Sequence, residues 1–395
     1  MPGPLSGIRV LDLTRVLAGP YATMVLADLG AEVIKIEMPG RGDDSRGVGP
    51  FYKGESAYFM SVNRGKKSVT VNAKTPKGVE IIRKLAAISD IMIENFRPGT
   101  ITNYGLDYES VKQVNPRIIY ASISGFGQTG PYTGRPAYDA IVQGMSGIAA
   151  ITGAPGQPPV RVGSSMADLS AALFCVIGIL SALCARHRTG RGQYIDLAML
   201  DSMVALLENA IVRYIVEGDV PSAMGSRHPS FTPFQFFKAK DRYLSLAVGN
   251  ESLWERFCQA IQRPDLLDEA RFKTNALRTE SHAALEPILT EVFARKTADE
   301  WVSIFEKAGI PSGPINTVAD VVNDPHVNER GMIVEMVHKT VGKLKVAGSP
   351  INLSEDRIEP HQAAPLLGEH TEEVLSGLLG MRGEEIARLR EADVI

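Results

Sequence analysis

Cysteine is scarce in this sequence, and the spacing needed for disulfides or metal ligands is absent. The three cysteines, Cys175, Cys184 and Cys258, are odd in number and include no CxxC pair. We therefore expect no disulfide framework, and a reducing, cytoplasmic location. The seven histidines are scattered and lack the spacing of a zinc site, so we also expect no metal.

An excess of charge of one sign is absent as well. Lysine and arginine number 42 against 45 aspartates and glutamates, which leaves a net charge of -3. This balance gives no global field that would attract nucleic acid or an anionic membrane. We therefore expect neither of them as a partner, although a local basic site is compatible with the composition.

The sequence shows no targeting signal and no very long apolar segment. Residues 1–7 contain no basic stretch followed by an apolar core, so no secretory or transit peptide is expected. The longest apolar run, residues 171–185, is shorter than the roughly 20 residues that cross a bilayer. We expect this run to form a core helix.

What the sequence does contain is an alternation of strand and helix patterns. Hydrophobic residues make up 44% of the 395 residues, which allows a large core and two or three domains. Alternating elements predict an α/β fold with a parallel sheet covered on both faces. Expected strands are 8–13, 31–37, 66–71, 90–94, 117–122 and 194–199, and expected helices include 21–29, 77–87 and 201–216.

A formal dinucleotide motif, Gly125 to Gly130, follows one of these strands. The segment after it, 131–136, contains two prolines and cannot open the helix that would hold a pyrophosphate. The first strand-helix loop, 14–20, lacks the three glycines of that fingerprint, although the second strand ends in the acidic Glu37. We therefore expect no NAD, and a nucleotide-like ligand would need side-chain cations for its phosphates.

Asp168 follows a turn of small residues, 163–167, and opens the apolar run. Unpaired N–H groups and the helix dipole favour the ionised form of an acid at a helix start. An ionised, partly desolvated carboxylate can attack an acyl group. Aspartate is also a preferred capping residue, and its position alone favours that simpler role. The nucleophile hypothesis needs support from the rest of the chain.

That support comes from a set of motifs: 5–20, 28–37, 94–99, 124–131, 186–193 and 365–371. Through this combination the chain resembles, over essentially its whole length, the class III coenzyme A transferases, or CaiB/BaiF family. The loop from Gly225 to Pro229, Gly-Ser-Arg-His-Pro, resembles the version found in transferases for small dicarboxylates such as oxalate and glutarate.

The resemblance implies a fold and an assembly. It implies a Rossmann-like large domain with a parallel sheet, a smaller inserted α+β domain, and an interlocked homodimer with its active site at the subunit interface. The composition shifts to Pro, Ser, Gly and aromatic residues near 221–233, which marks a boundary. The expected divisions are 1–205 for the N-terminal part of the large domain, 206–225 for a linker, 226–318 for the small domain and 319–395 for the return to the large domain.

The resemblance also implies the reaction. Asp168 would attack a donor acyl-CoA such as succinyl-CoA, giving a mixed anhydride and then an aspartyl-CoA thioester, from which CoA passes to a small mono- or dicarboxylic acid. Family positions for coenzyme A contacts fall on Arg15, Val16, Ala18, Val71, Lys74, Arg97, Asn103, Tyr104, Tyr138 and Met199. Candidate substrate or oxyanion groups are Gly125, Gly127, Gly130 and His228.

The match is uneven at the coenzyme A positions. Met38 stands where a basic residue is often found, Asn103 replaces an arginine, and Pro136 replaces a lysine of the formyl-CoA transferases. These three departures concern the adenine and phosphate contacts.

Two alternatives to CoA transfer are open. Racemases of the same fold carry a histidine before the aspartate equivalent to Asp139, whereas this chain has Tyr138 there. A neutral phenol is a poor base near neutral pH, which disfavours the exchange of an α proton on a 2-methylacyl-CoA. The other alternative is a CoA-binding subunit without chemistry.

Overall fold

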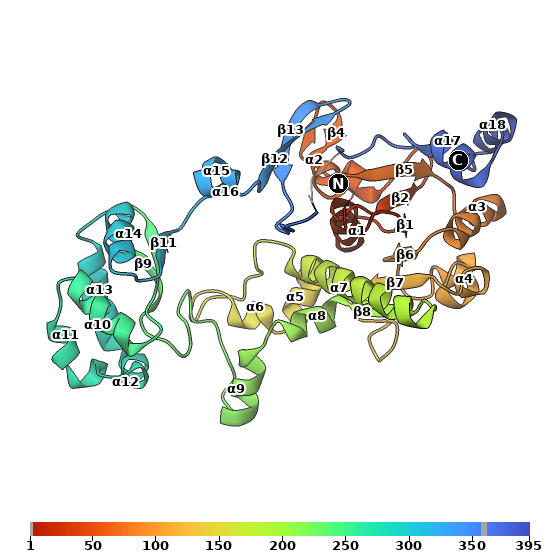
Figure 1. Cartoon of the computed structure of the whole chain (residues 1–395). Helices are drawn as coiled ribbons and strands as arrows, with labels where there is room; N and C mark the ends of the chain where they lie inside the picture. Colours follow the sequence, from red (N-terminus) through yellow and green to blue (C-terminus); the bar gives the residue numbers. More distant parts are fainter. Residues whose placement is uncertain (1–2, 357–361) are drawn as a thin grey trace. The chain divides into compact units, whose positions relative to one another are not determined.

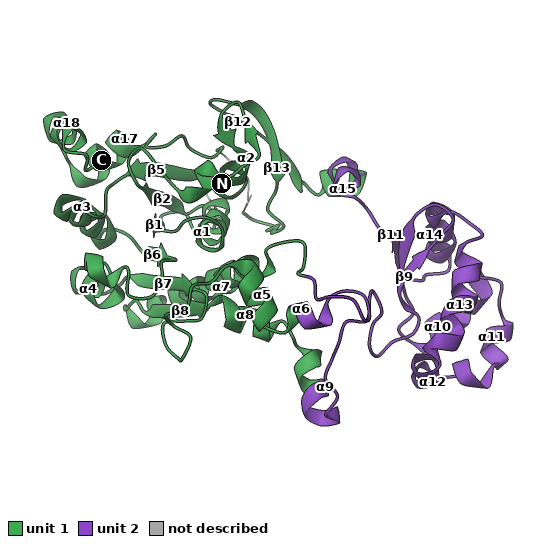
Figure 2. Ribbon diagram, turned by 180° about the vertical axis from the view of Figure 1, so that it is seen from behind, with its two compact units in different colours: residues 1–148, 161–212, 325–395 green, residues 149–160, 213–324 purple. Residues whose placement is uncertain are grey.

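The computed structural model describes residues 3–356 and 362–395 (Figure 1). The chain forms two compact units, shown in different colours in Figure 2. Unit 1 comprises Met1–Ile148, Arg161–Val212 and Pro325–Ile395, and unit 2 comprises Ala149–Val160 and Arg213–Asp324. The domain boundaries expected from the sequence stay a prediction.

Unit 1 is built on a parallel sheet of six strands in the order β5-β2-β1-β6-β7-β8. The strands are β1 (Arg9–Asp12), β2 (Glu32–Glu37), β5 (Lys66–Thr70), β6 (Ile91–Glu94), β7 (Ile119–Ser124) and β8 (Tyr194–Ala198). Val10 of β1 pairs with Val33 of β2 on one side and with Ile91 of β6 on the other. In chain order, strands are added first on the β2 side of β1 and then on its β6 side. The loops that follow the neighbouring strands β1 and β6 therefore diverge between these two strands. The predicted α/β fold with a parallel sheet is confirmed.

Neighbouring residues of a strand point to opposite faces of this sheet, and helices cover both faces. Val10 joins a core with α1 (Ala18–Asp28) and α7 (Met166–Thr189). Leu11, the next residue, joins a core with α3 (Pro76–Ala87), α17 (Thr371–Leu379) and α18 (Gly383–Glu391). Strands buried on both faces explain why their sequences read as nearly continuous apolar runs.

Helix α7 is longer than the apolar run that predicted it. It extends to 24 residues because Met166–Ser170 and Arg186–Thr189 continue the helix at the two ends. Among the described residues, α7 is the one helix that is long and apolar enough to cross a membrane, and 50% of its most apolar window is buried in the protein. The expected length was therefore wrong. Although α7 packs into the core, part of its surface is exposed.

The single helix expected over 201–216 is instead two helices, α8 (Met199–Ala205) and α9 (Asn209–Glu217). The chain turns between them, where Glu208 has a φ of 36° that a continuing α-helix does not allow. Helix α1 starts at Ala18, three residues before the expected start. Pro20 is tolerated there because first-turn N–H groups have no partner within the helix.

Unit 2 contains an antiparallel sheet in the order β11-β10-β9. These strands are β9 (Phe234–Lys238), β10 (Tyr243–Ala247) and β11 (Ser312–Pro314), and helices α10 (Glu251–Ala260), α13 (His282–Phe293) and α14 (Ala298–Lys307) surround an aromatic core. Within that core, Trp301 stacks on Phe305 with a centroid distance of 5.5 Å.

The remaining elements are short. They are η1 (Asp44–Gly47), β3 (Phe51–Tyr52), β4 (Glu55–Ser56), α2 (Ala57–Val62), η2 (Thr102–Tyr104), α4 (Tyr108–Val114), α5 (Asp139–Met145), α6 (Ile148–Ile151), α11 (Asp265–Asp268), η3 (Ala270–Phe272), α12 (Asn275–Glu280), α15 (Val318–Asn323), α16 (Pro325–Glu329), β12 (Ile333–His338) and β13 (Gly342–Ala347).

Candidate active site

A cavity of about 240 Å³ lies in unit 1 at the carboxyl ends of the parallel strands. Its walls come from the loops that follow β1, β2, β5 and β6 and from η2. Ligands of open α/β sheets bind at this edge, where the strand order reverses. Four of the residues expected to contact coenzyme A line the cavity: Arg15, Val71, Lys74 and Tyr104.

Cations and acids alternate around this cavity. Arg15 pairs with Asp44 at 3.1 Å, Arg41 pairs with the same carboxylate at 2.6 Å, and the Arg15 guanidinium lies 5.2 Å from the centre of the Phe96 ring. Lys74 is exposed, and within the described part of the chain it forms no ion pair. Such flexible, partly screened cations can turn toward phosphate groups at little cost.

Glu37, the acid that ends β2, is committed to the protein itself. It is buried and accepts two hydrogen bonds from Arg46, at 2.7 and 2.8 Å, and a third from Ser68 at 2.7 Å. Burial raises the pKa of Glu37, but Arg46, Lys35 and Ser68 outweigh it and lower the pKa. Glu37 is therefore a structural anion and does not offer a carboxylate to a ribose.

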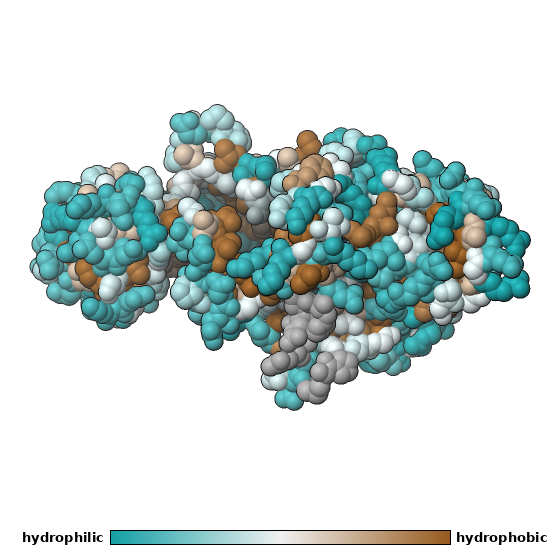
Figure 3. Space-filling view, turned by 90° about the horizontal axis from the view of Figure 1, so that it is seen from above, coloured by the Kyte–Doolittle hydropathy of each residue, from teal (hydrophilic) through white to brown (hydrophobic). Residues whose placement is uncertain are grey.

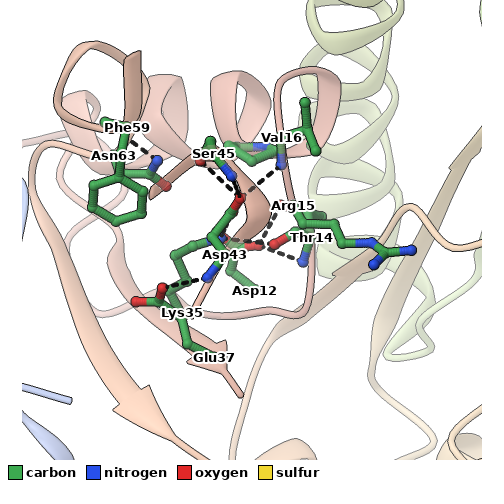
Figure 4. Close-up of polar contacts among 12 residues, drawn as sticks. Asp12, Thr14, Arg15, Val16, Lys35, Glu37, Asp43, Ser45, Phe59 and Asn63 are labelled. Atoms are coloured by element: carbon green, nitrogen blue, oxygen red, sulfur yellow. Dashed lines mark hydrogen bonds and ion pairs between the residues drawn. The ribbon is translucent and has the colours of Figure 1, made fainter. Parts of the chain in front are cut away.

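Buried charged side chains contact the backbone of the loop between β1 and α1 (Figure 4). The Asp43 carboxylate accepts the backbone N–H of Val16 at 3.0 Å, and Lys35 pairs with Asp43 at 2.8 Å. Two residues beyond Val16, the chain enters α1 at Ala18. The loop thus links the cavity wall at Arg15 to the first turn of this helix.

Asp168 lies in the first turn of α7 and is half-buried. The backbone N–H of Ala18, the first residue of α1, lies near its carboxyl group and lowers the pKa of Asp168. The capping bond of α7 is formed by another residue, since Asp139 accepts the Ala167 N–H at 2.9 Å. The structure thus gives the capping role to Asp139, and Asp168 lies where the starts of two packed helices meet.

The surroundings of Asp168 favour its protonated form. Burial raises the pKa of Asp168, the neighbouring Asp139 raises it further, the Ala18 N–H opposes both, and the result is a pKa of about 7. The expectation that the helix start would keep Asp168 ionised was wrong, because burial and a like charge outweigh the N–H donor. Such a pKa is typical of functional carboxyl groups.

Tyr58, which sequence reasoning missed, lies near the same carboxyl groups. Burial raises the pKa of the Tyr58 phenol, and the charges of Asp168, Asp43 and Asp139 raise it further. The hydroxyl therefore stays protonated and can donate a hydrogen bond. Tyr58 belongs to the short α2, and no sequence signal distinguished it from the other aromatic residues.

Comparison with known proteins identifies the family. The model of CoA-transferase family III matches residues 5–371. The chain belongs to CoA-transferase family III. The protein is accordingly a transferase, and CoA thioesters are its substrates.

Curated relatives of this family III protein cover nearly the whole chain. Succinyl-CoA:glutarate CoA-transferase from Mus musculus is 45% identical over 99% of this chain and 90% of the relative. Acetyl-CoA:oxalate CoA-transferase from Acetobacter aceti is 42% identical over 93% of this chain and 94% of the relative. A crystal structure of a CaiB/BaiF family protein from Brucella suis is 41% identical, with a TM-score of 0.86, and covers 96% of this chain and 100% of that chain.

The glycine-rich segment of this family III chain follows β7. A Cβ atom on Gly125 would lie 2.2 Å from the Cβ of Ala137, so only glycine fits there. Gly127 and Gly130 have φ angles of 85° and 91°, and the Gly127 N–H donates to Ser124 at 3.0 Å. That N–H is already used within the turn, which argues against Gly127 as an oxyanion donor. For Gly125 and Gly130 this role stays a prediction.

The other expected site residues lie in varied surroundings. Arg97 and Asn103 are exposed, Tyr138 is 78% exposed, and Met199 is buried in the core that contains residues of α1 and α7. None of these four lines the cavity described above. His228 belongs to unit 2, where its ring packs against Phe231 and Phe234 with centroid distances of 4.9 and 5.1 Å.

Two of the three cysteines, Cys175 and Cys258, are buried, and Cys184 is exposed. All three are unpaired by disulfides, and burial raises the pKa of the Cys175 and Cys258 thiols to about 12. Within residues 3–356 and 362–395, no three His, Cys, Asp or Glu residues are grouped so that they could hold a metal ion. The expectations of no metal and no NAD stay predictions, as does the cytoplasmic location.

Proposed function

We propose that this protein transfers CoA from an acyl-CoA such as succinyl-CoA to a small dicarboxylic acid, with Asp168 as the nucleophile. The names of the relatives support the substrate class, since they act on glutarate and oxalate. The single observation that carries the proposed mechanism is the position of Asp168. It is a half-buried carboxyl group at the start of α7 with a raised pKa, and the N–H of Ala18 at the start of α1 lies near it.

In the first half-reaction, a carboxylate oxygen of Asp168 attacks the thioester carbonyl of the donor. The C–S bond breaks, CoA leaves as a thiolate, and Asp168 is left as a mixed anhydride with the donor acyl group. The thiolate then attacks the aspartyl carbonyl, which releases the donor as a free carboxylate and leaves an aspartyl-CoA thioester. No oxidant or external proton is required.

The second half-reaction repeats these steps with the acceptor. The acceptor carboxylate attacks the aspartyl-CoA thioester and displaces the thiolate, and the thiolate attacks the acceptor acyl carbonyl of the new anhydride. Asp168 returns as a carboxylate and the acceptor leaves as its CoA thioester. Each intermediate retains the thioester's free energy provided that water is excluded.

We place the coenzyme A moiety in the cavity at the carboxyl ends of the strands. Arg15 and Lys74 of its wall supply cations for its phosphates, Val71 and Tyr104 supply apolar wall, and Arg97, an exposed residue outside the wall, is proposed as a further cation. The remaining family positions, Val16, Ala18, Asn103, Tyr138 and Met199, are proposed as further contacts. His228 and the N–H groups of Gly125 and Gly130 are proposed for the acyl and acceptor carboxylates.

We also propose the homodimer and the inserted small domain. Helix α7 has apolar side chains that reach its surface, with Leu173 49% and Ile177 57% exposed, and on α9 Val216 is 75% exposed. Exposed apolar side chains of this kind are typical of protein interfaces. The boundaries 1–205, 206–225, 226–318 and 319–395 stand as the proposed domain divisions.

The experiment that tests the nucleophile is chemical trapping. After incubation with succinyl-CoA, borohydride or hydroxylamine should modify Asp168, as read by peptide mass spectrometry. Asp168→Asn should lose at least about a thousandfold in kcat/KM with glutarate or oxalate, because no covalent intermediate can form. Asp201 occupies the same third helical position at the start of α8 and is exposed, so Asp201→Asn is the matched control and should keep wild-type transfer.

Two outcomes would contradict the proposal. An unmodified Asp168 across several donors, in a protein that still transfers CoA, would exclude it as nucleophile. Incorporation of solvent deuterium into a 2-methylacyl-CoA, without any acceptor-dependent transfer, would favour the racemase reaction instead.

A further inference from the structure

In the loop Thr14–Leu17 that precedes α1, the backbone of three successive residues forms hydrogen bonds with side chains from other segments. The Thr14 N–H donates to Asp12 at 2.8 Å, and its carbonyl accepts from Lys35 at 2.7 Å. The Asn95 amide bonds both backbone groups of Arg15, accepting the N–H at 2.9 Å and donating to the carbonyl at 2.8 Å. This loop is therefore held by groups from β1, β2 and the turn after β6.

Val16, the next residue, has a backbone conformation that its side chain disfavours. Its φ is 68°, in the left-handed region, which is rare for a β-branched residue. A residue stays in that region only when its surroundings determine it strongly, and such residues cluster at functional sites. The backbone of Arg15, the residue before Val16, is held by Asn95, and the N–H of Val16 is itself held by a further side chain.

Asp43 is the group that holds the Val16 N–H. Its side chain is buried, with 4% of the residue exposed. One carboxylate oxygen accepts three bonds, from the Val16 N–H at 3.0 Å, the Ser45 N–H at 2.8 Å and the Ser45 hydroxyl at 2.7 Å. The other oxygen pairs with the fully buried Lys35 at 2.8 Å. Figure 4 shows these bonds converging on Asp43 beneath Val16.

The conformation of Val16 matters because it sets the direction in which the chain enters α1. Two residues after Val16, the Ala18 N–H lies near the Asp168 carboxyl group and lowers its pKa. Relaxation of Val16 to an extended or helical φ would reorient the start of the helix. The Ala18 N–H would then no longer be directed at Asp168.

We propose that Asp43, assisted by Asn95, is a positioning residue for CoA transfer, which holds Val16 in its left-handed conformation and so directs the Ala18 N–H at Asp168. The inference rests on the proposed role of Asp168 as nucleophile. Asp43 also lines the cavity in which coenzyme A is placed, but its carboxylate is buried and bonded to Val16, Ser45 and Lys35, so we assign it an effect through Val16. A buried ion pair is costly to desolvate, and a role in fixing one conformation is a physical reason to keep it.

The test is a double-mutant cycle with Val16→Gly, because glycine adopts a positive φ without strain. Asp43→Asn should lower kcat/KM about 10- to 100-fold and move the inflection of its pH profile toward higher pH. In the Val16→Gly background the same change should cost less than about threefold. A role of Asp43 in stability alone would give equal losses in both backgrounds, and that result would overturn the proposal.

A control variant breaks a comparable ion pair at the other end of α1. Asp28 and Arg64 are both buried and bond at 2.9 and 2.6 Å. Asp28→Asn should lower the melting temperature while leaving kcat/KM and the pH inflection unchanged. Should Asp43→Asn fail to fold, the same cycle is run with Asn95→Asp, which removes the bond to the Arg15 carbonyl, and the same outcomes decide.

A second readout separates this inference from the proposed function. Amide hydrogen exchange of the peptide 13–20 reports the loop without any turnover. Asp43→Asn should speed this exchange at least about tenfold, and Asp28→Asn should not. If Asp43→Asn speeds this exchange but the wild type transfers no CoA, the proposed function is refuted, whereas the role of Asp43 in holding the loop stands. Unchanged exchange in Asp43→Asn would overturn that role.

Discussion

At the scale of single residues, Asp168 combines a need for negative charge with surroundings that oppose it. In the proposed mechanism the attacking form is the carboxylate, yet burial and the neighbouring Asp139 raise the pKa of Asp168 to about 7. Burial also strips water from the oxygen atoms, which makes the ionised fraction a better nucleophile. If Asp168 is the nucleophile as proposed, the Asp139 charge should affect the pH dependence of the reaction.

We predict that kcat/KM increases about tenfold per pH unit below pH 7 and reaches a plateau above it, as Asp168 of the unliganded enzyme loses its proton. Asp139→Asn should move this inflection to lower pH, because the like charge that raises the pKa of Asp168 is gone. The amide oxygen can still accept the Ala167 N–H, so α7 keeps its cap.

The measurement is a pH profile of kcat/KM from pH 5 to 9 for both proteins, with melting curves to verify folding. An inflection that does not move, or moves upward, would show that Asp139 does not set the ionisation of Asp168.

The same raised pKa predicts a gain in stability when the charge is removed. An unfolded aspartate titrates near 3.9, so between about pH 4 and pH 7 the folded state binds the extra proton. Unfolding free energy therefore falls as pH rises through this window, and the loss is complete above about pH 7. Because Asp168 is half-buried, we discount the effect to about 1–3 kcal/mol.

Asp168→Asn should accordingly be more stable than wild type by about 1–3 kcal/mol at pH 8 and nearly equal to it at pH 4. Urea unfolding at the two pH values measures the difference. The control Asp201→Asn should show no gain that depends on pH. Equal stability of Asp168→Asn and wild type at pH 8 would show that the ionised Asp168 carboxylate does not destabilise the folded protein.

How far sequence predicts the site differs from residue to residue. Asp168 and Arg15 could be found because they belong to recognisable motifs, and the structure brings Asp168 to the start of α1 and Arg15 to the cavity wall. Asp43 gave no signal, since its importance depends on Val16, which lies 27 positions earlier in the chain. Contacts between distant segments of this kind are invisible without the fold.

At the scale of elements, the strands of the sheet were predictable and the helix ends were not. Residues such as Val33 and Ile34 are buried on opposite faces, so their apolar runs carry a strong strand signal. The start of α1 follows a loop whose Val16 N–H donates to Asp43, and the break between α8 and α9 lies at Glu208, which has a positive φ. Neither is encoded in hydrophobic periodicity, which is why both boundaries differed from expectation.

At the scale of the whole molecule, large apolar side chains are exposed on the surface of a single chain. Figure 3 shows brown, apolar residues between the polar ones on the face that it presents. Exposed residues of α7 include Leu173, Ile177, Ser181 and Cys184, whose spacing places them along one side of the helix. The opposite side packs into the core of unit 1, so this exposed side is available to a second copy.

We predict that the protein sediments at twice the 42.7 kDa of one chain, and that Ile177→Glu weakens this association by at least about tenfold, because a charge would be buried in an apolar contact. Val114 on α4 is a matched control, since it is 46% exposed and lies outside this side of α7. Val114→Glu should leave the dimer intact.

Analytical ultracentrifugation over a range of concentrations distinguishes the outcomes. A monomeric wild type would refute the dimer, whereas a dimer insensitive to Ile177→Glu would place its interface on another surface. A loss of transfer that parallels dissociation would further indicate that each active site needs both subunits.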